Sequence, residues 1–431
     1  MRISYVVYRI SQKANYNMRS TICDIRTTKI MYPESKIDLS VDFCGIRFEN
    51  PFILAAAPPT DELDMVRDAF AAGWAGAVLK TTAMPGTPVD LVYPLIAGID
   101  YEGTRAVGLT NIDLISYYHV DIIEERVKLL KTEFPSKIVI ASITGQTKDD
   151  WTALVERLEN AGCDMIEASF SCPQGTLGLP PGAMLAQDAV AAAQVTSWIK
   201  SAAKRCPIVI KLTPLVNDIA AVAKAVCDAG ADAVCVGNTV PSLTGIDLET
   251  GIPYPQVGDK STYSGLSGPM IRPISLGCIA KVAKAGIAIS GSGGATTWRD
   301  ALEFMLLGAS VVQFGTAVMH YGSDIITDLI EGVRNHLKRK GITAIREVIG
   351  QSLQNIVSHE ELERGVKVRA SIDHEKCIRD DLCMLACRDG GHRAITVDAE
   401  RNPIVDEEKC VGCGLCCAIC PVTDCIKLMK R

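Results

Sequence analysis

The sequence predicts an α/β fold in which a (β/α)8 TIM barrel is followed by a small, cysteine-rich α+β module. Between Pro51 and Thr316, eight short apolar runs rich in β-branched residues alternate with amphipathic helical patterns. Polar or glycine residues follow these runs, and the last 55 residues hold nine of the 17 cysteines. Eight strands with helical crossovers in roughly 265 residues match such a barrel in number and length.

The predicted strands are short runs of four to six residues, bounded by turn-forming or charged residues. In chain order they are Phe52–Ala57, Gly76–Lys80, Lys137–Ser142, Met165–Ser169, Pro207–Lys211, Ala233–Gly237, Ile287–Ser290 and Val311–Phe314. A doubly wound sheet is the alternative, but such a sheet usually carries G-x-G-x-x-G after its first strand. Here the first run ends in AAAPPT, which favours the barrel.

Helical patterns separate most of these runs, and several begin at an Asp or Thr in capping position. They cover residues 61–72, 149–161, 188–204, 218–229 and 297–307. In the predicted barrel, each helix would return the chain to the start of the next parallel strand.

The chain divides by pattern into four segments: an extension (1–36), the barrel (37–340), a linker (341–370) and the cysteine-rich module (371–431). The extension carries seven Lys and Arg against two acidic residues and shows no sustained apolar period, so we expect it to be disordered. The linker has no long Gly/Ser tract, which predicts a docked module rather than a tethered one.

The overall charge of −6 excludes a broad basic footprint for nucleic acid or an anionic membrane. No stretch of about 18 uninterrupted apolar residues predicts a transmembrane helix. Outside the module the cysteines are isolated, which favours a reducing cytoplasm over a disulfide-rich secreted protein.

Seven C-terminal cysteines follow the spacing of a bacterial ferredoxin with two iron–sulfur clusters. One motif reads C-x2-C-x2-C-x3-C-P from Cys410, and an earlier one from Cys377 reads C-x2-D-x2-C-x3-C, with Asp380 in the second position. In this pattern the fourth ligand of each motif serves the other cluster. The first cluster is therefore assigned Cys377, Asp380, Cys383 and Cys420, and the second Cys410, Cys413, Cys416 and Cys387.

Asp380 leaves the type of the first cluster open. A carboxylate is a harder ligand than a thiolate and should hold iron less tightly. The site could therefore carry an Asp-ligated [4Fe–4S] cluster or a three-iron [3Fe–4S] cluster that lacks the iron at Asp380. In either case the module predicts one-electron transfer to or from the barrel.

Polar and glycine residues recur at the carboxyl ends of the predicted strands. In a TIM barrel all of these positions lie at the rim that carries catalysis, and the loops after the last two strands commonly bind phosphate. The positions are Lys80-Thr81, Ser142, 169–172, 211–213, Asn238-Thr239, 291–294 and Gly315-Thr316.

The order of these motifs resembles that of the flavin-dependent dihydroorotate and dihydropyrimidine dehydrogenases, in particular the bacterial NAD-dependent dihydropyrimidine dehydrogenases. It covers roughly Ile37 to Lys427 and reads ILAAAPPT, AVLKT, NIDLIS, SFSCP, IKLTP, GNTV, SGLSG with IRPI, SGSGG and QFGT. The resemblance implies an FMN cofactor, with Lys211 beside the N1/O2 edge of the flavin. The implied FMN contacts are Ala56, Lys80, Thr81, Lys211, Gly268, Ser292, Gly293, Gly294, Gly315 and Thr316.

The resemblance also implies that Cys172 protonates C5 of a pyrimidine while reduced FMN gives hydride to C6. Cys172 lies in a Gly/Pro-rich stretch without helical or strand period, which is typical of a mobile lid. The implied substrate residues are Asn111, Ser169, Ser171, Asn238 and Thr239. Ser169 departs from the family, which usually has Asn there, and serine cannot offer the paired donor and acceptor of an amide.

The sequence thus predicts an oxidoreductase acting on CH–CH groups, which reduces the C5–C6 bond of uracil or thymine or catalyses the reverse oxidation. A dihydroorotate dehydrogenase-type activity and a non-catalytic electron-transfer subunit are the alternatives. Since no pyridine-nucleotide fingerprint is visible, electrons should come from an FAD- and NAD(P)-binding partner subunit or from a ferredoxin. We also expect an oligomer.

Overall fold

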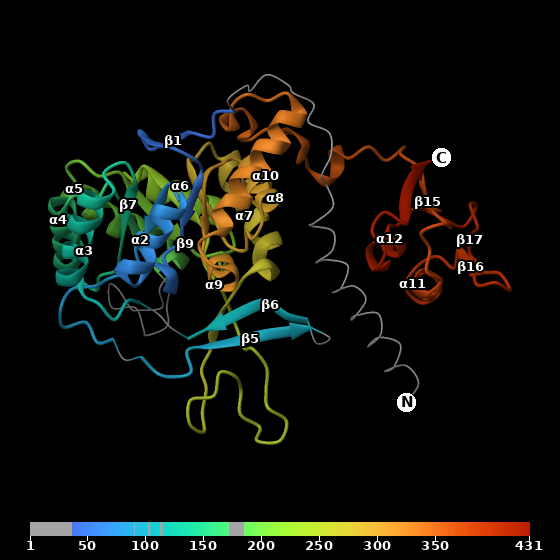
Figure 1. Ribbon diagram of the computed structural model, residues 1–431, viewed down its shortest axis with the longest axis horizontal. Coiled ribbons are helices and arrows are strands. Elements are labelled where there is room, and N and C mark those ends of the chain that lie inside the picture. Colours follow the sequence, from blue (N-terminus) through green and yellow to red (C-terminus); the bar gives the residue numbers. More distant parts are fainter. Residues whose placement is uncertain (1–36, 90, 102–103, 113–114, 172–184) are drawn as a thin grey trace. The chain divides into compact units, whose positions relative to one another are not determined.

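The structure is a computed structural model that describes residues 37–89, 91–101, 104–112, 115–171 and 185–431 (Figure 1). The predicted extension (1–36) and Cys172 therefore lie outside the described residues. The chain divides after Leu353 into two compact units, the second being Gln354–Arg431. They are described separately below as the barrel unit and the cluster unit.

Eight parallel strands of the barrel unit close into a barrel, which confirms the predicted fold class. All eight predicted runs form its strands, and β14 closes the ring by pairing with β3. Strands buried on both faces need continuous apolar sequence, which these runs supply. In chain order the strands are β3 (Phe52–Leu54), β4 (Gly76–Val78), β7 (Ile138–Ile143), β8 (Met165–Ser169), β9 (Ile208–Leu212), β10 (Ala233–Val236), β13 (Ile289–Ser292) and β14 (Ala309–Phe314).

Helices surround the barrel, and the five predicted helical stretches are all present. Side chains of Thr147, Asp188, Asp218 and Thr297 cap four of them, as the sequence indicated. Two crossover helices, α3 and α7, were not among the predicted stretches, and neither has a side-chain cap at its start. The helices are α2 (Leu63–Ala72), α3 (Val120–Glu133), α4 (Lys148–Ala161), α5 (Ala189–Ala202), α6 (Ile219–Asp228), α7 (Arg272–Lys284), α8 (Trp298–Leu306), α9 (Thr316–Tyr321) and α10 (Ile325–Lys340).

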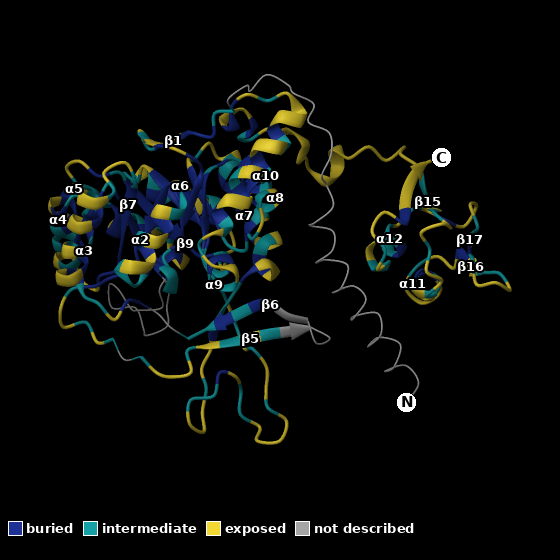
Figure 2. Cartoon of the chain, viewed as in Figure 1, coloured by how far each residue is buried: buried dark blue, intermediate teal, exposed yellow. Residues whose placement is uncertain are grey.

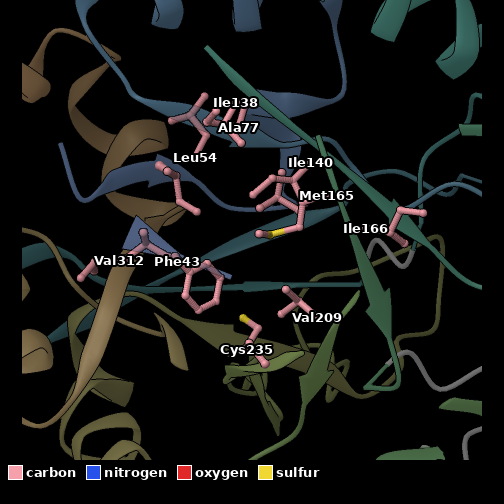
Figure 3. Packing of buried hydrophobic residues seen from close by; sticks show 14 of the residues in the cluster. Phe43, Leu54, Ala77, Ile138, Ile140, Met165, Ile166, Val209, Cys235 and Val312 are labelled. Carbon is pink, nitrogen blue, oxygen red and sulfur yellow. The ribbon is translucent and has the colours of Figure 1, made fainter. Parts of the chain in front are cut away.

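The core lies inside the barrel and between the strands and the helices. Figure 2 shows buried strands enclosed by helices whose outer faces are exposed. Met165, Val209 and Cys235 come from three neighbouring strands and lie close together in Figure 3, with Phe43 of the β1 hairpin beside them. That hairpin, β1 (Val41–Phe43) and β2 (Ile46–Phe48), lies at the end of the barrel away from β5 and β6 (Figure 1).

A four-stranded antiparallel sheet stands outside the barrel and was not predicted. Its strands are β5 (Ile96–Tyr101), β6 (Thr104–Asn111), β11 (Val240–Ser242) and β12 (Ser264–Ser267), in the order β11-β12-β6-β5. They belong to two long excursions, one between β4 and β7 and the other between β10 and β13. Through β6 and β11 the sheet brings Asn111 and the segment after Asn238 to the rim of the barrel.

The cluster unit has the α+β content that its sequence predicted. Strands β15 (Val368–Ile372) and β18 (Ile426–Lys430) pair antiparallel, as do β16 (Ile395–Val397) and β17 (Pro403–Val405). Two short helices, α11 (Leu382–Gly390) and α12 (Leu415–Ile419), each follow a cysteine-containing loop. Within the described parts of the chain, no helix is long and apolar enough to span a membrane.

Candidate active site and cluster-binding loops

A cavity of about 630 Å³ opens at the carboxyl ends of the barrel strands, a size typical of sites for small molecules and cofactors. The structure brings all fifteen described residues predicted to contact flavin or substrate into the lining of this cavity. They are Ala56, Lys80, Thr81, Asn111, Ser169, Ser171, Lys211, Asn238, Thr239, Gly268, Ser292, Gly293, Gly294, Gly315 and Thr316. Their shared location follows from the barrel, whose strands all end at one rim. Their contacts with a ligand remain predictions.

Glycine backbone forms one wall of the cavity, after β13 and before α7. Gly268, Gly293 and Gly294 have φ values of +90°, +107° and +94°, which L side chains rarely adopt. A Cβ added to Gly294 would lie 2.7 Å from both the Arg272 nitrogen and the Gly268 oxygen. The two backbone segments can therefore meet only because no side chain separates them. Such bare backbone is well suited to the close approach of a phosphate group.

Lys211 lies on the floor of the cavity and is 5% exposed. Its Nζ is 3.4 Å from Oε1 of Glu167, which is 1% exposed. Burial acts to lower the pKa of the lysine, but the neighbouring Glu167 carboxylate outweighs this effect, so the pKa lies above its usual value. The site therefore holds a fixed positive charge where an anionic ligand edge could lie.

Glu167 and Gln313 form a buried polar network that sequence analysis missed. The Gln313 Nε2 donates hydrogen bonds to Glu167 Oε2 (2.7 Å) and Ser290 Oγ (3.0 Å). Since a carboxylate only accepts, this contact fixes the orientation of the amide. The available signal was a polar residue inside an apolar strand run, as in MIEAS and VVQF.

The predicted substrate side chains form a polar corner of the cavity. Asn238 donates through its Nδ2 to Ser171 Oγ, and its Oδ1 accepts from the backbone N–H of Thr239 at 2.8 Å. Ser169 pairs with Lys211 across β8 and β9, so the position that departs from the family lies directly beside the cavity lysine. The corner offers hydroxyls and an amide, which suit a polar ring edge.

The second predicted cluster set is assembled in the cluster unit. Cys387, Cys410, Cys413 and Cys416 line one small cavity. Backbone N–H groups point at two of these sulfurs, from Ala394 to Cys387 Sγ at 3.2 Å and from Ala370 to Cys410 Sγ at 3.4 Å. Such N–H···S bonds are a usual feature of iron–sulfur sites and tune their potentials.

The first predicted set also gathers, around the buried thiol of Cys383. Burial raises its pKa to about 11, and the Asp380 carboxylate, Cys377 and Cys420 lie near enough to contribute. Asp380 Oδ1 accepts from the Leu382 N–H at 3.1 Å, whereas its Oδ2 is buried without a hydrogen-bond partner among the described residues. A buried, unpartnered carboxylate oxygen at a ligand position suits a bound iron.

Other side chains near the clusters do not extend these sets. Cys425, outside the spacing pattern, is buried beside Cys420. Among the described residues, no three His, Cys, Asp or Glu side chains converge on a point where a single metal ion could bind. This is compatible with clusters, in which the ligands bind separate iron atoms.

Two family models match the chain. The dihydroorotate dehydrogenase model matches residues 38–337, and the 4Fe-4S dicluster domain model matches residues 370–428. The first match covers the described cavity residues, and the second covers both cysteine motifs.

Curated relatives match the chain over most of its length. The NAD-dependent dihydropyrimidine dehydrogenase subunit PreA of Escherichia coli (strain K12) is 37% identical over 399 residues, 91% of this chain and 95% of the relative. The chloroplastic dihydropyrimidine dehydrogenase (NADP(+)) of Arabidopsis thaliana is 33% identical over 78% of this chain and 81% of its own. The catalytic subunit of dihydroorotate dehydrogenase B (NAD(+)) of Pyrococcus horikoshii is 36% identical over 73% of this chain and 98% of its own.

Proposed function

This chain belongs to the dihydroorotate dehydrogenase family of oxidoreductases, which act on CH–CH groups, and from that membership we propose that it is a flavin-dependent pyrimidine oxidoreductase. The reaction is reduction of the C5–C6 bond of a pyrimidine such as uracil or thymine, or the reverse oxidation. The observation that carries the proposal is the cavity at the carboxyl end of the barrel, where all fifteen predicted flavin and substrate residues lie together.

The cavity has two chemically distinct parts that suit FMN. The glycine wall around Gly293 and Gly294 would hold the phosphate through backbone N–H groups. Lys211 would place its ammonium at the flavin edge where negative charge accumulates on reduction. Flavin held by these residues would supply the hydride for the pyrimidine ring.

The polar corner of Asn111, Ser171, Asn238 and Thr239 would hold the pyrimidine through hydroxyls and amides. Asn238 is already positioned by its hydrogen bonds to Ser171 and Thr239, which reduces the entropy lost on binding. Cys172 follows Ser171 directly and would deliver the proton to C5 from its thiol.

Electrons would reach the flavin through two iron–sulfur clusters in the cluster unit. The Escherichia coli and Pyrococcus horikoshii relatives are each named as one subunit of an NAD-dependent enzyme, which supports an electron-donating partner for this chain. We propose an FAD- and NAD(P)-binding subunit or a ferredoxin in that role.

A dihydroorotate dehydrogenase-type reaction is the second candidate, and Ser169 is the observation that favours it. Serine cannot form the paired hydrogen bonds of the amide that the family usually has at this position. A site that lacks one such partner discriminates less strongly for the ring that needs it. The substrate could then be a related cyclic amide with a different substituent.

The test combines flavin identity with half-reactions of the full chain. Denaturation after anaerobic reconstitution should release FMN. The photoreduced protein should then be reoxidised by uracil or thymine, and reoxidation by orotate instead would favour the second candidate. Release of FAD, or reoxidation by none of the three substrates, would contradict the proposal.

Replacing Ser169 with asparagine should raise kcat/KM for uracil, because the amide restores one paired contact to the ring. A gain of about tenfold is expected, since a hydrogen bond is worth roughly 0.5–1.5 kcal/mol. Steady-state rates with an artificial electron donor measure the change, and Ser171→Asn serves as a control in which the polar corner is disturbed. Equal or lower uracil activity in Ser169→Asn would indicate a pocket rebuilt for another ring.

Replacing Asp380 with cysteine should convert the first cluster to a more stable [4Fe–4S] form, because a thiolate binds iron more tightly than a carboxylate. The full iron content is then about eight atoms per chain, against about seven where the native first cluster holds three irons. Anaerobic iron and sulfide assays with EPR, before and after added ferrous iron, measure the change. Asp389→Cys, on the exposed face of α11, adds a thiol outside the ligand spacing and should leave the spectra unaltered. Identical cluster lifetimes in native protein and Asp380→Cys would contradict ligation at this position.

A further inference from the structure

A buried charge pair lies at the floor of the cavity. Lys211 and Gln313 line the cavity, while Glu167 lies behind them, 1% exposed. The pair joins β8 to β9 through Glu167 Oε1 and Lys211 Nζ at 3.4 Å, and Gln313 ties the other carboxylate oxygen to β14. Glu167 therefore has no direct access to a ligand but contacts two residues that do.

Burying this ion pair contributes little to the stability of the fold. Removing a carboxylate and an ammonium from water is costly, and their attraction often does no more than offset that cost. Gln313 Oε1 is also buried without a hydrogen-bond partner among the described residues. Replacing such a pair by apolar residues of similar volume is often neutral or stabilising. The retained charges thus point to a task connected with the cavity.

We propose that Glu167 is a positioning residue that acts through Lys211, holding the ammonium charged at the cavity floor and thereby setting how strongly the site prefers reduced over oxidised flavin. The inference rests on the proposed flavin site. A positive charge beside the N1/O2 edge stabilises the negative charge of reduced flavin. The Glu167 carboxylate guarantees that charge and at the same time partly offsets its field at the flavin.

The charged and titratable groups around Lys211 explain why Glu167 is needed. Cys235 on β10 faces the lysine, but burial keeps the pKa of its thiol well above the usual value, so it stays neutral. Lys80, at the end of β4, lines the same cavity, and its positive charge disfavours the protonated form of Lys211. Glu167 is thus the anion in contact with Lys211 among the described residues. Without it, burial would lower the pKa of Lys211, as for other buried lysines.

The test measures the midpoint potential of bound flavin in the full chain between about pH 6 and pH 9. In the native protein Lys211 stays charged over this range, so no lysine-linked break is expected. In Glu167→Gln a new break should appear, because the ammonium is present below the lowered pKa and lost above it. Above the break, the preference for reduced over oxidised flavin should fall at least tenfold, about 30 mV for two electrons.

Two comparisons separate this role from a structural one. Glu159→Gln alters another buried carboxylate, which lies at the opposite end of the barrel. This carboxylate accepts hydrogen bonds from the backbone N–H groups of Arg205 and Cys206, just before β9. The substitution should lower stability without moving the flavin potential. In a Lys211→Met background, adding Glu167→Gln should create no new break in the pH profile of the potential, because the lysine whose titration causes the break has gone.

An unchanged pH profile of the potential in Glu167→Gln would overturn the inference, and so would the same break in the Lys211→Met background. Native protein that retains no flavin would instead contradict the proposed function. Should Glu167→Gln fail to fold, Glu167→Asp keeps the charge but withdraws it by one CH2. It should shift the break in the same direction by a smaller amount. An unshifted profile would also overturn the inference.

Discussion

Replacing Cys172 with alanine is expected to slow substrate reduction by about 10²–10⁴-fold, the usual effect of removing a general acid. The proton for C5 then has to come from water or a poorly placed group, while hydride transfer to C6 still requires it. Reduction of the flavin by an artificial donor should remain normal, because that half-reaction uses no proton from Cys172. Stopped-flow measurement of the two half-reactions separates these effects.

The pH dependence gives the same assignment an independent signature. A general acid must be protonated, and free thiols titrate near a pKa of about 8.5. The rate of substrate reduction should therefore fall as pH rises through the thiol pKa, and Cys172→Ala should lack this break. Cys278→Ala, on the half-buried side of α7, is a matched loss of a thiol and should leave both half-reactions unaffected. Near-normal turnover of Cys172→Ala would mean that another group supplies the proton.

The barrel itself could be predicted from local sequence because each strand is buried on both faces and must be apolar along its whole length. The helices with Thr or Asp caps were equally visible. The antiparallel sheet was not, since β12 reads SGLS and β11 contains Pro241, so neither carries the usual pattern of a strand. β12 pairs with β6, which lies more than a hundred residues earlier in the chain, and β11 pairs with β12. A local sequence pattern cannot indicate such long-range pairing.

Some residues of the candidate site could likewise be predicted from local sequence, and others could not. Residues at strand ends could be predicted because the barrel fixes where every strand ends. Glu167 and Gln313 lie inside apolar runs and are 146 residues apart, so only closure of the ring makes them partners. The spacing alone predicts Asp380 as a cluster ligand, and this role stays a prediction. Its buried, unpartnered Oδ2 became visible only in the folded loop.

Replacing Gly294 with alanine should strongly weaken flavin binding and destabilise the barrel. The new Cβ would meet two backbone atoms at 2.7 Å, the Arg272 nitrogen and the Gly268 oxygen, and neither can rotate away. Alanine is also strained by the positive φ of +94° at this position. Strain and overpacking together are expected to cost about 2–5 kcal/mol of unfolding free energy.

The effect on flavin follows from the same displacement. Hydrogen bonds to a charged phosphate are worth roughly 1.5–3 kcal/mol each, so losing one lowers FMN affinity by about 10- to 150-fold. Fluorescence titration of the apoprotein with FMN measures the affinity, and chemical denaturation of the apoprotein measures the stability. Gly258→Ala is the matched control: its φ is +64°, but nothing lies within 4 Å of the added Cβ. It should cost only the backbone strain, about 1–2 kcal/mol, and leave FMN affinity unchanged. If Gly294→Ala binds FMN as tightly as Gly258→Ala does, the wall of glycines is not the phosphate site, and the flavin must bind elsewhere in the cavity.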